Sequence, residues 1–187
     1  LLAGAAISAR AASFPGEPSG RKVERLTPIV PPGAQSIRNV ASKCVGCMLC
    51  VSACKGKVLK PSLAPGRFLQ PELQYSKGGY CLPDCTACSD VCPTGAIQPL
   101  GALLKSQVSI GRATIDERSC MTYTRDARCG ICARRCTYGA IRMVDGHPQV
   151  DYSKCTGCGK CEMVCPAKAI LVEGREKHKI FEKLFAE

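Results

Sequence analysis

The sequence predicts a small α+β protein built from four copies of one unit, which runs loop, short helix, turn and strand. Three observations predict this fold class. The 187 residues contain 16 cysteines, which fall into four sets of four with none left over. A tight turn and a short apolar run follow each set. Aromatic residues make up 5% of the chain and Trp is absent, so something other than an aromatic core must hold the fold together.

The cysteines are the candidate metal ligands. All four sets end with the same spacing, in which two residues and then three residues separate the last three cysteines. The first gap is two residues in the first and fourth sets, three in the second and eight in the third. The sets consist of Cys44, Cys47, Cys50 and Cys54; Cys81, Cys85, Cys88 and Cys92; Cys120, Cys129, Cys132 and Cys136; and Cys155, Cys158, Cys161 and Cys165.

Disulfide bonds and structural zinc are two alternatives for these cysteines. Three sulfurs within one or two turns of chain are poorly placed to bridge one another without strain, which disfavours a disulfide framework. Zinc ribbons and fingers usually supply two cysteine pairs separated by a long insert rather than a compact triple. Both alternatives stay open, but neither explains the spacing.

The fourth set shows the third alternative most clearly. The run "CTGCGKCEMVCP", residues 155–166, has the spacing of bacterial ferredoxins that bind [4Fe-4S] clusters. In that pattern three thiolates hold one cube, and the fourth ligand, here Cys165, follows on a helical turn and reaches a neighbouring cube. Pro166 then ends the turn, because it has no backbone N–H to donate. The spacing therefore predicts four [4Fe-4S] clusters as cofactors.

The sequence around the cysteines repeats as well. After the last cysteine of each set, a turn and an apolar run predict an edge strand. These segments are "KGKVL" (55–59), "PTGAI" (93–97), "TYGAI" (137–141) and "PAKAI" (166–170). Four such units make two pairs of clusters. A strand, turn and strand is also predicted in 140–155, with the bend at Asp145 and Gly146.

The third set differs because eight residues, "MTYTRDAR", separate Cys120 from Cys129. All four ligands are still present, so we expect a complete cluster site. A site of three cysteines with a separate thiol is the alternative. The insert carries charged residues and is predicted to bulge into solvent.

With these motifs the chain resembles the periplasmic polyferredoxins of the NapG/MauM type. The resemblance rests on the order of the four spacings, on "CPTGAI", on "CTGCGKCEMVCP" and above all on the eight-residue gap, and it covers about residues 30–172. Two departures are the three-residue gap after Cys81 and Lys55, which stands where a proline often follows the last ligand. The resemblance implies an electron-transfer partner of the kind that accompanies periplasmic nitrate reductase and methylamine dehydrogenase systems.

The resemblance also implies how the sets pair, since in related four-cluster subunits the first set pairs with the fourth and the second with the third. It predicts two nested, bacterial-ferredoxin-like dicluster modules, residues 41–65 plus 147–172 and residues 66–146. The four predicted sites are Cys44, Cys47, Cys50 and Cys165; Cys54, Cys155, Cys158 and Cys161; Cys81, Cys85, Cys88 and Cys136; and Cys92, Cys120, Cys129 and Cys132.

The charge balance agrees with bound clusters. The 26 Lys and Arg residues exceed the 15 Asp and Glu residues by 11. Sixteen thiolates and four oxidised cubes at about +2 each contribute about −8, so the loaded protein would carry about +3. Basic side chains beside the cysteines are expected to stabilise the reduced clusters. They are Lys43, Lys55, Lys57, Arg134, Arg135, Lys154, Lys160 and Lys168.

The ends of the chain predict its location. "LLAGAAISARAA", residues 1–12, is typical of the end of a signal peptide or membrane anchor, with a disordered terminus as the alternative. Together with the proline-rich stretch that follows, it forms a predicted extended arm, 1–40, acting as a tether or a passive linker. Residues 173–187 are predicted to form a C-terminal helix with one apolar stripe. We expect export of the folded, cluster-loaded protein to the periplasmic side of the cytoplasmic membrane, with a cytoplasmic location left open.

The sequence offers little for catalysis. It has no phosphate-binding loop, dinucleotide fingerprint or activated nucleophile, and no set has only three cysteines, as an open iron site would need. It therefore predicts a membrane-associated polyferredoxin, not an enzyme, that relays single electrons between redox protein partners, a membrane subunit among them. Neither nucleic acid nor a small-molecule substrate is expected. Two alternatives are a subunit fixed in a larger redox complex and a structural metal-binding scaffold. His147 and His178 are expected to be solvated rather than ligands.

Overall fold

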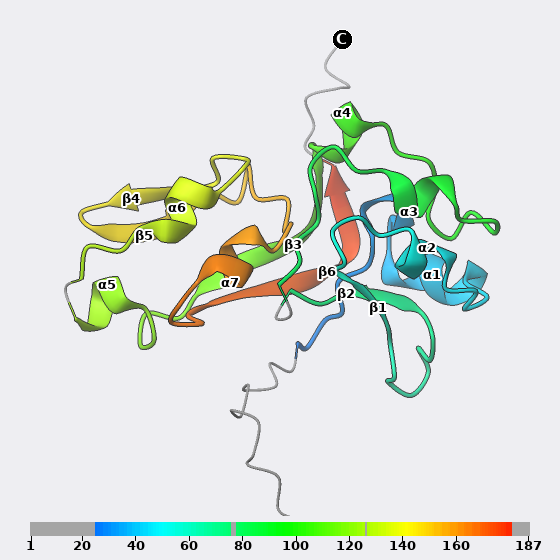
Figure 1. Cartoon of the computed structure of the whole chain (residues 1–187), viewed down its shortest axis with the longest axis horizontal. Helices are drawn as coiled ribbons and strands as arrows, with labels where there is room; N and C mark the ends of the chain where they lie inside the picture. The colour runs from blue at the N-terminus through cyan, green and yellow to red at the C-terminus, as the bar shows by residue number, and fades with distance from the viewer. Residues whose placement is uncertain (1–24, 76–77, 126, 181–187) are drawn as a thin grey trace, which may run out of the picture.

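The computed structural model describes residues 25–75, 78–125 and 127–180 as an elongated molecule with two lobes (Figure 1). The elements of the first lobe and of the link after it are η1 (Pro32–Ala34), α1 (Ile37–Lys43), α2 (Leu49–Ser52), β1 (Leu59–Pro61), β2 (Pro71–Leu73), α3 (Ala87–Asp90) and α4 (Ala102–Lys105). The elements of the second lobe are β3 (Val108–Ile115), α5 (Met121–Thr124), α6 (Ile131–Arg135), β4 (Ile141–Val144), β5 (His147–Val150), α7 (Lys160–Val164) and β6 (Ile170–Ile180). The predicted α+β class is confirmed. Among the helices of these ranges, none has the length and apolar character needed to cross a membrane.

Within the described residues, three two-stranded antiparallel sheets connect these elements. β1 pairs with β2, β3 with β6, and β4 with β5. In the β3–β6 pair Ile115 lies opposite Ile170, so the strand that enters the third cysteine set lies beside the strand that leaves the fourth. β4 and β5 meet at Asp145 and Gly146, whose backbones are left-handed with φ of 50° and 81°. This hairpin confirms the predicted strand, turn and strand.

The unit predicted from the sequence is complete at the first, third and fourth cysteine sets, and the second set lacks only its strand. A short helix, α2, α3, α6 or α7, contains the third cysteine and ends before the fourth. A strand, β1, β4 or β6, follows the turn after the first, third and fourth sets, while no strand is assigned to 93–97. The third residue after the last cysteine is left-handed in all four units. These residues are Lys57 (φ 51°), Gly95 (φ 65°), Gly139 (φ 59°) and Lys168 (φ 52°).

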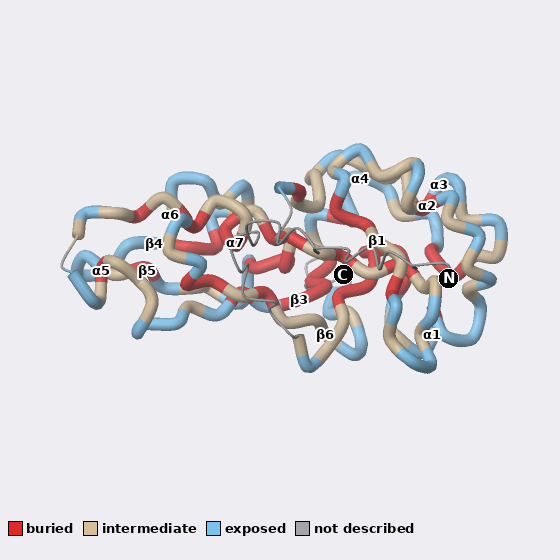
Figure 2. The backbone as a smooth tube through the Cα atoms, turned by 60° about the horizontal axis from the view of Figure 1, so that its bottom comes forward, coloured by how far each residue is buried: buried red, intermediate tan, exposed pale blue. Residues whose placement is uncertain are grey.

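The core runs along the middle of both lobes (Figure 2). It consists of aliphatic side chains interleaved with cysteines, and Ile29, Ile97 and Ile110 are among the most buried of them. Tyr75 is the largest fully buried side chain of the described chain. The apolar core is therefore continuous with the cysteine sites and depends on them for its volume.

The nested modules implied by the resemblance are wrong. The first and second sets share one lobe, and the third and fourth share the other, so the predicted modules 41–65 plus 147–172 and 66–146 each mix the two lobes. The hairpins β1–β2 and β4–β5 lie between the sets of each lobe. Pairing neighbours through a hairpin closes a shorter loop than nesting distant sets, and so costs less chain entropy.

Two predictions for the chain ends also change. The described part of the predicted arm is packed rather than free, since Ile29 and Val30 are buried and the Leu73 N–H donates to the Ile29 carbonyl at 2.8 Å. Residues 173–180 continue β6, so the predicted C-terminal helix is wrong over this part. Pairing with β3 overrides the local helical pattern, because it satisfies the backbone of both strands. Residues 1–24 and 181–187 lie outside the described residues.

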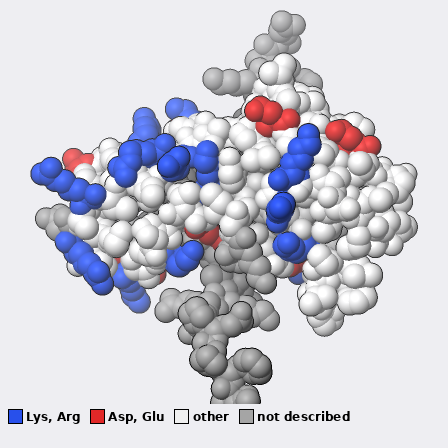
Figure 3. Space-filling model, in the orientation of Figure 1, with Lys and Arg blue, Asp and Glu red and all other residues white. Residues whose placement is uncertain are grey.

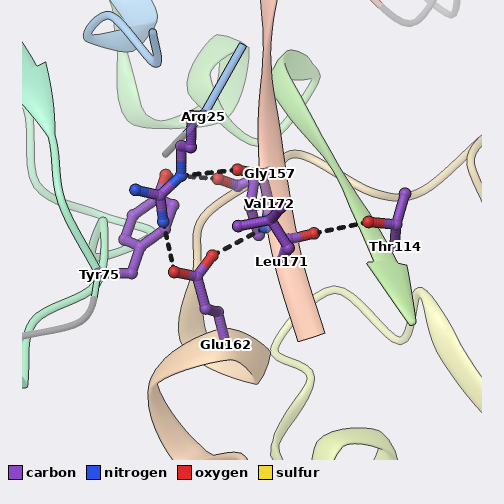
Figure 4. Close-up of polar contacts among 7 residues, drawn as sticks. All are labelled: Arg25, Tyr75, Thr114, Gly157, Glu162, Leu171 and Val172. Carbon is purple, nitrogen blue, oxygen red and sulfur yellow. Dashed lines mark hydrogen bonds and ion pairs between the residues drawn. The ribbon is translucent and has the colours of Figure 1, made fainter. Parts of the chain in front are cut away.

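Tyr75 and a buried ion pair fasten the two lobes together (Figure 4). The Tyr75 hydroxyl donates to the Gly157 carbonyl at 2.6 Å. The Arg25 guanidinium lies 5.5 Å from the centre of the Tyr75 ring, pairs with Glu162 and donates from Nε to the Val172 carbonyl at 2.9 Å. The Arg25 and Glu162 side chains are 12% and 8% exposed, so solvent ions screen this pair little.

Candidate metal centres

Four cavities in the described part of the chain are each lined by four cysteines. Site A contains Cys44, Cys47, Cys50 and Cys92; site B contains Cys54, Cys81, Cys85 and Cys88; site C contains Cys136, Cys155, Cys158 and Cys161; and site D contains Cys120, Cys129, Cys132 and Cys165. The empty space is about 340 Å³ in sites B, C and D and about 360 Å³ in site A. Cavities of similar size with the same donor set suit four copies of one bound group.

Each site takes three cysteines from one set and the last cysteine of another, as predicted. The partner set is different from the predicted one in all four sites. Cys92 replaces Cys165 in site A, and Cys54 replaces Cys136 in site B. Cys136 replaces Cys54 in site C, and Cys165 replaces Cys92 in site D. All sixteen predicted ligands are thus gathered in fours, but in a different combination.

The short helices explain this exchange of the fourth cysteine. α2 contains Cys50 of site A and ends before Cys54 of site B. α3, which packs against α2, contains Cys88 of site B and ends before Cys92 of site A. α6 and α7 pack together in the same way between sites C and D. The two sites of one lobe are therefore neighbours.

The eight-residue insert leaves site D complete. Cys120 lines this site beside Cys129 and Cys132, so the alternative of a separate thiol does not apply. The insert begins with α5, where Thr122 is 4% exposed and its Oγ1 lies 3.3 Å from the Cys120 sulfur. The prediction of a solvent bulge is wrong for this helix, because its buried face covers the site, but it holds for Arg125 and Arg128 after the helix, which are exposed.

The two histidines are not solvated as expected. His147 is half-buried, and its ring stacks on Tyr123 of the insert with ring centroids 4.2 Å apart. His178 is half-buried too, with Nδ1 3.0 Å from the Pro32 carbonyl oxygen. Burial lowers the pKa of His178 to about 4, so its ring is neutral at pH 7. Neither histidine lines sites A to D.

Burial keeps several of the thiols protonated in the free protein. It raises the pKa of Cys50 to about 11, with further increases from Cys44 and Cys47, and raises the pKa of Cys158 to about 11. Metal ligation requires thiolates, so loading these sites releases protons. Cys92 is different: burial raises its pKa too, but hydrogen bonds from the Ile97 N–H, from the Thr94 hydroxyl and from the backbone of Thr94 and Ala96 together outweigh the burial and lower the pKa.

Backbone N–H groups point at the sulfur of the last cysteine in three of the four sets of the described chain. A left-handed residue turns the backbone toward the sulfur: Gly139 and Lys168 come directly before their donors, and Gly95 comes two residues before Ile97. N–H donors of this kind tune the charge and potential of an iron–sulfur site. The bonds run from Ile97 to Cys92 at 3.4 Å, from Ala140 to Cys136 at 3.2 Å and from Ala169 to Cys165 at 3.3 Å.

The cysteines of each site surround a cavity instead of converging on one point. Nowhere in residues 25–75, 78–125 and 127–180 do three His, Cys, Asp or Glu side chains lie close enough to hold a single metal ion. A cube of four iron and four sulfide ions spreads its thiolate ligands more widely than one tetrahedral zinc ion does. The donor sets therefore fit [4Fe-4S] clusters.

Sequence reasoning missed Lys105, which ends α4 at the edge of site B. Its side chain is 6% exposed, and Nζ donates to the Leu82 carbonyl at 2.6 Å and to the Cys85 carbonyl. The eight basic residues predicted from the sequence are exposed, apart from Lys160, which is half-buried. The sequence feature that could have indicated its burial is that it is the only charged residue in the largely apolar run "PLGALLKSQVSI", residues 99–110.

Two lobes with two four-cysteine sites each define a ferredoxin-type iron–sulfur protein. The family model of the 4Fe-4S binding domain matches residues 148–171, which include the fourth set. The methylamine utilization ferredoxin-type protein MauM of Methylobacillus flagellatus is 29% identical over 160 residues, covering 78% of this chain and 67% of MauM. The ferredoxin-type protein NapG of Escherichia coli is 31% identical over 154 residues, covering 72% of this chain and 64% of NapG. These relatives and the matching domain support a ferredoxin of the NapG/MauM type.

A third relative is the ferredoxin-type protein NapF of Escherichia coli, 28% identical over 173 residues, covering 89% of this chain and 98% of NapF. The chain spans about two thirds of the length of the MauM and NapG proteins that it matches. A solved formate dehydrogenase, heterodisulfide reductase and formylmethanofuran dehydrogenase complex from Methanospirillum hungatei is 20% identical, with a TM-score of 0.28, over 73% of this chain and 51% of that one. That likeness is too low to support an argument.

Proposed function

We propose that the chain holds four [4Fe-4S] clusters in the order A, B, C, D and relays single electrons along this line. The observation that carries the proposal is the lobe junction, where the N–H of Cys81, in site B, donates to the carbonyl of Cys158, in site C, at 2.9 Å. Sites A and B are linked through α2 and α3, and sites C and D through α6 and α7. Each site is therefore connected to the next one in the line through a few residues of packed or hydrogen-bonded backbone.

The chain's own residues would hold, space and shield the clusters. A bound [4Fe-4S] cluster supplies a reversible change of one electron. The N–H groups of Ile97, Ala140 and Ala169 offset part of the negative charge that the electron adds. Apolar side chains such as Leu59 at site B and Val172 at site C keep water from the sulfurs. Because the four sites lie within one folded chain, no part of the protein needs to move for an electron to pass, which favours rapid electron transfer.

Site A is the proposed docking end for one redox partner. Cys47 is exposed, and Val45 beside it is 70% exposed. The loop between β1 and β2 adds Leu63 and Phe68, which are 78% and 66% exposed, next to Leu69 of the site A wall. Exposed apolar surface around a ligand suits a protein interface. The same surface favours a second candidate function, an electron-transfer subunit fixed in a larger redox complex with a membrane subunit.

Site D is the proposed end for the other partner, and its surroundings are basic. Arg125, Arg128, Arg134 and Arg135 are all exposed near the third cysteine set. Figure 3 shows Lys and Arg side chains gathered over the second lobe, whereas the far end of the first lobe is nearly free of charge on this face. The two ends thus suit partners of different surface chemistry.

We further propose that the protein works at the periplasmic side of the cytoplasmic membrane. The support is the run of small and apolar residues at 1–12, which lies outside the described part of the chain. Sixteen cysteines in an oxidising compartment would have to be loaded before export. Fractionation of cells that make the full chain, followed by iron analysis of each fraction, tests this. Loaded protein confined to the cytoplasm contradicts it.

The first experiment is to measure iron, acid-labile sulfide and zinc in one anaerobically purified sample. The proposal expects about 16 iron and 16 sulfide ions per chain with little zinc. The Ser89→Ala variant is a matched control, because Ser89 is buried in α3 but lines none of the four sites, and it should keep the same iron content. A content of about 12 iron ions per chain would show that one of the four sites holds no cluster. Zinc in place of iron would overturn the proposed electron relay. Co-purification of a partner in equal amount separates a fixed subunit from a free carrier.

A further inference from the structure

We infer that the buried ammonium of Lys105 raises the reduction potential of the cluster at site B, so that site B accepts an electron before its neighbours A and C. The inference rests on the proposed function, because it needs a cluster at site B. It assigns Lys105 as a positioning residue that acts through the site B ligands without being one of them.

No carboxylate of the described residues forms an ion pair with Lys105. It is the most buried Lys or Arg in the described ranges. None of the ion pairs found among those residues includes it. A buried ammonium is costly unless acceptors and opposite charge surround it. Its acceptors are the Leu82 and Cys85 carbonyls. A negatively charged group at site B supplies the missing balance.

The loop of the second cysteine set is built around this ammonium. Three residues separate Cys81 from Cys85, where the first and fourth sets have two. Leu82 lies in this longer gap and Cys85 ends it, and the carbonyls of both accept hydrogen bonds from Lys105 Nζ. The longer gap between Cys81 and Cys85 therefore supplies the two carbonyls that bind the Lys105 ammonium, and site B still has all four of its cysteines.

The position of Lys105 gives its charge a role in electron passage. Lys105 lines the cavity of site B and also a space of about 200 Å³ between the lobes, which Cys81 and Cys158 border. One electron entering site B makes that site more negative by one charge, as the neighbouring site that gives it up becomes less negative by one. A fixed positive charge in a low-dielectric interior stabilises the reduced form and raises its potential.

The test is a potentiometric titration of the loaded protein followed by electron paramagnetic resonance. The signal of site B is the one that a Cys85→Ser variant alters. At a fixed potential we expect Lys105→Met and Lys105→Gln to lower the reduced-to-oxidised ratio of site B by about tenfold or more, which is about 59 mV for one electron. Lys105→Arg should keep the ratio. The matched control is Lys55→Met, which removes the same charge from an exposed position next to Cys54 of the same site and should change the ratio by less than about threefold.

The outcomes separate this inference from the proposed function. A wild-type protein without iron and sulfide contradicts the proposed function itself. Full iron content with an unchanged site B ratio in Lys105→Gln overturns the inference and leaves the relay standing. If both neutral variants lose the iron of site B, the wild-type titration decides, because site B should be reduced before sites A and C. Reduction of site B after either of them overturns the role of Lys105.

Discussion

The backbone N–H of Cys81 donates a hydrogen bond to the carbonyl of Cys158, with 2.9 Å between nitrogen and oxygen, across the junction of the two lobes. Each residue lines a different four-cysteine site, so this one bond connects sites B and C. Tyr75 and the pair of Arg25 and Glu162 hold the junction from nearby. The spacing of these two sites is therefore set inside one folded chain rather than by docking of separate carriers.

The grouping of the cysteines predicts how iron is lost from paired variants. Cys129 and Cys165 line the same site, whereas Cys129 and Cys161 line different sites. Each single change to Ala should remove about four iron ions per chain, because the cluster loses a ligand. The Cys129→Ala/Cys165→Ala double variant should lose no more than a single variant, while Cys129→Ala/Cys161→Ala should lose about eight. Iron analysis of anaerobic samples measures this, and about eight ions lost from the first pair would restore the nested arrangement.

Gly159 is predicted to control the lobe junction. Its backbone is left-handed with φ of 82°, and a Cβ atom there would overlap the ring of Tyr75. Gly159→Ala should displace Tyr75, lower the free energy of unfolding by about 2 kcal/mol or more, and slow electron passage from sites A and B to sites C and D. Gly130→Ala is the control, since this glycine holds the equivalent position (φ 65°) but faces only the flexible side chains of Met143 and Arg134. Equal stopped-flow rates and urea midpoints for the two variants would show that contact with Tyr75 is unimportant.

The ion pair at the junction predicts a loss of stability when one partner is removed. Arg25→Met should lower the free energy of unfolding by about 3 kcal/mol, because Glu162 is then left buried and without its partner. The surface pair of Arg38 and Glu176 serves as the control, since its side chains are 90% and 71% exposed with 3.6 Å between nitrogen and oxygen. Arg38→Met should cost less than about 1 kcal/mol in the same urea titration. A cost for Arg25→Met as small as that would mean that water reaches the junction.

Substitutions at the left-handed residue that follows the last cysteine should have opposite effects on stability in the third and fourth sets. Gly139 has φ of 59° with open space where a Cβ would lie, so Gly139→Ala should destabilise by about 1–2 kcal/mol through the backbone alone. Lys168 occupies the same position in the fourth set with φ of 52°, and Lys168→Gly should stabilise by about 1 kcal/mol. Urea midpoints of the loaded proteins check both signs. Destabilisation by Lys168→Gly would show that the lysine side chain contributes more than its backbone strain costs.

His178 predicts a loss of stability at mildly acidic pH. Its pKa is about 4 in the folded protein, against the ordinary value of 6.5, because burial disfavours the charged ring. Above pH 6.5 the ring is neutral in both states and contributes nothing. As the pH falls from 6.5 toward 4 the unfolded chain binds a proton that the folded chain does not, and up to about 3 kcal/mol of stability is lost. Unfolding of His178→Gln across this range should show a smaller pH dependence than the wild type, and an identical dependence contradicts the assignment.

Much of the local structure follows from the sequence because it depends on near neighbours. The spacing of the cysteines places the third of each set in a short helix and the fourth just after it, as in α7 with Cys161 and Cys165. Asp145 and Gly146 make the bend between β4 and β5, because both accept a left-handed backbone. The family resemblance also comes from the sequence, through the order of the four gaps. The C-terminal strand does not follow, since its pairing with β3 lies far along the chain.

The sequence by itself determined the sixteen candidate ligands, their division into four equivalent units and the exchange of one cysteine between sites. Only the tertiary structure decided which sets exchange it, because any two identical units satisfy the same local spacing and packing of α2 on α3 selects the pair. The tertiary structure also decided which basic side chain lies close enough to a cysteine site to influence it. The basic residues that border the cysteines in the sequence mostly face solvent, whereas Lys105, 13 residues beyond Cys92, is buried against site B. The electrostatic influence of a basic side chain on a site depends on its burial and on its distance from the site in space. The number of residues between them along the chain reveals neither.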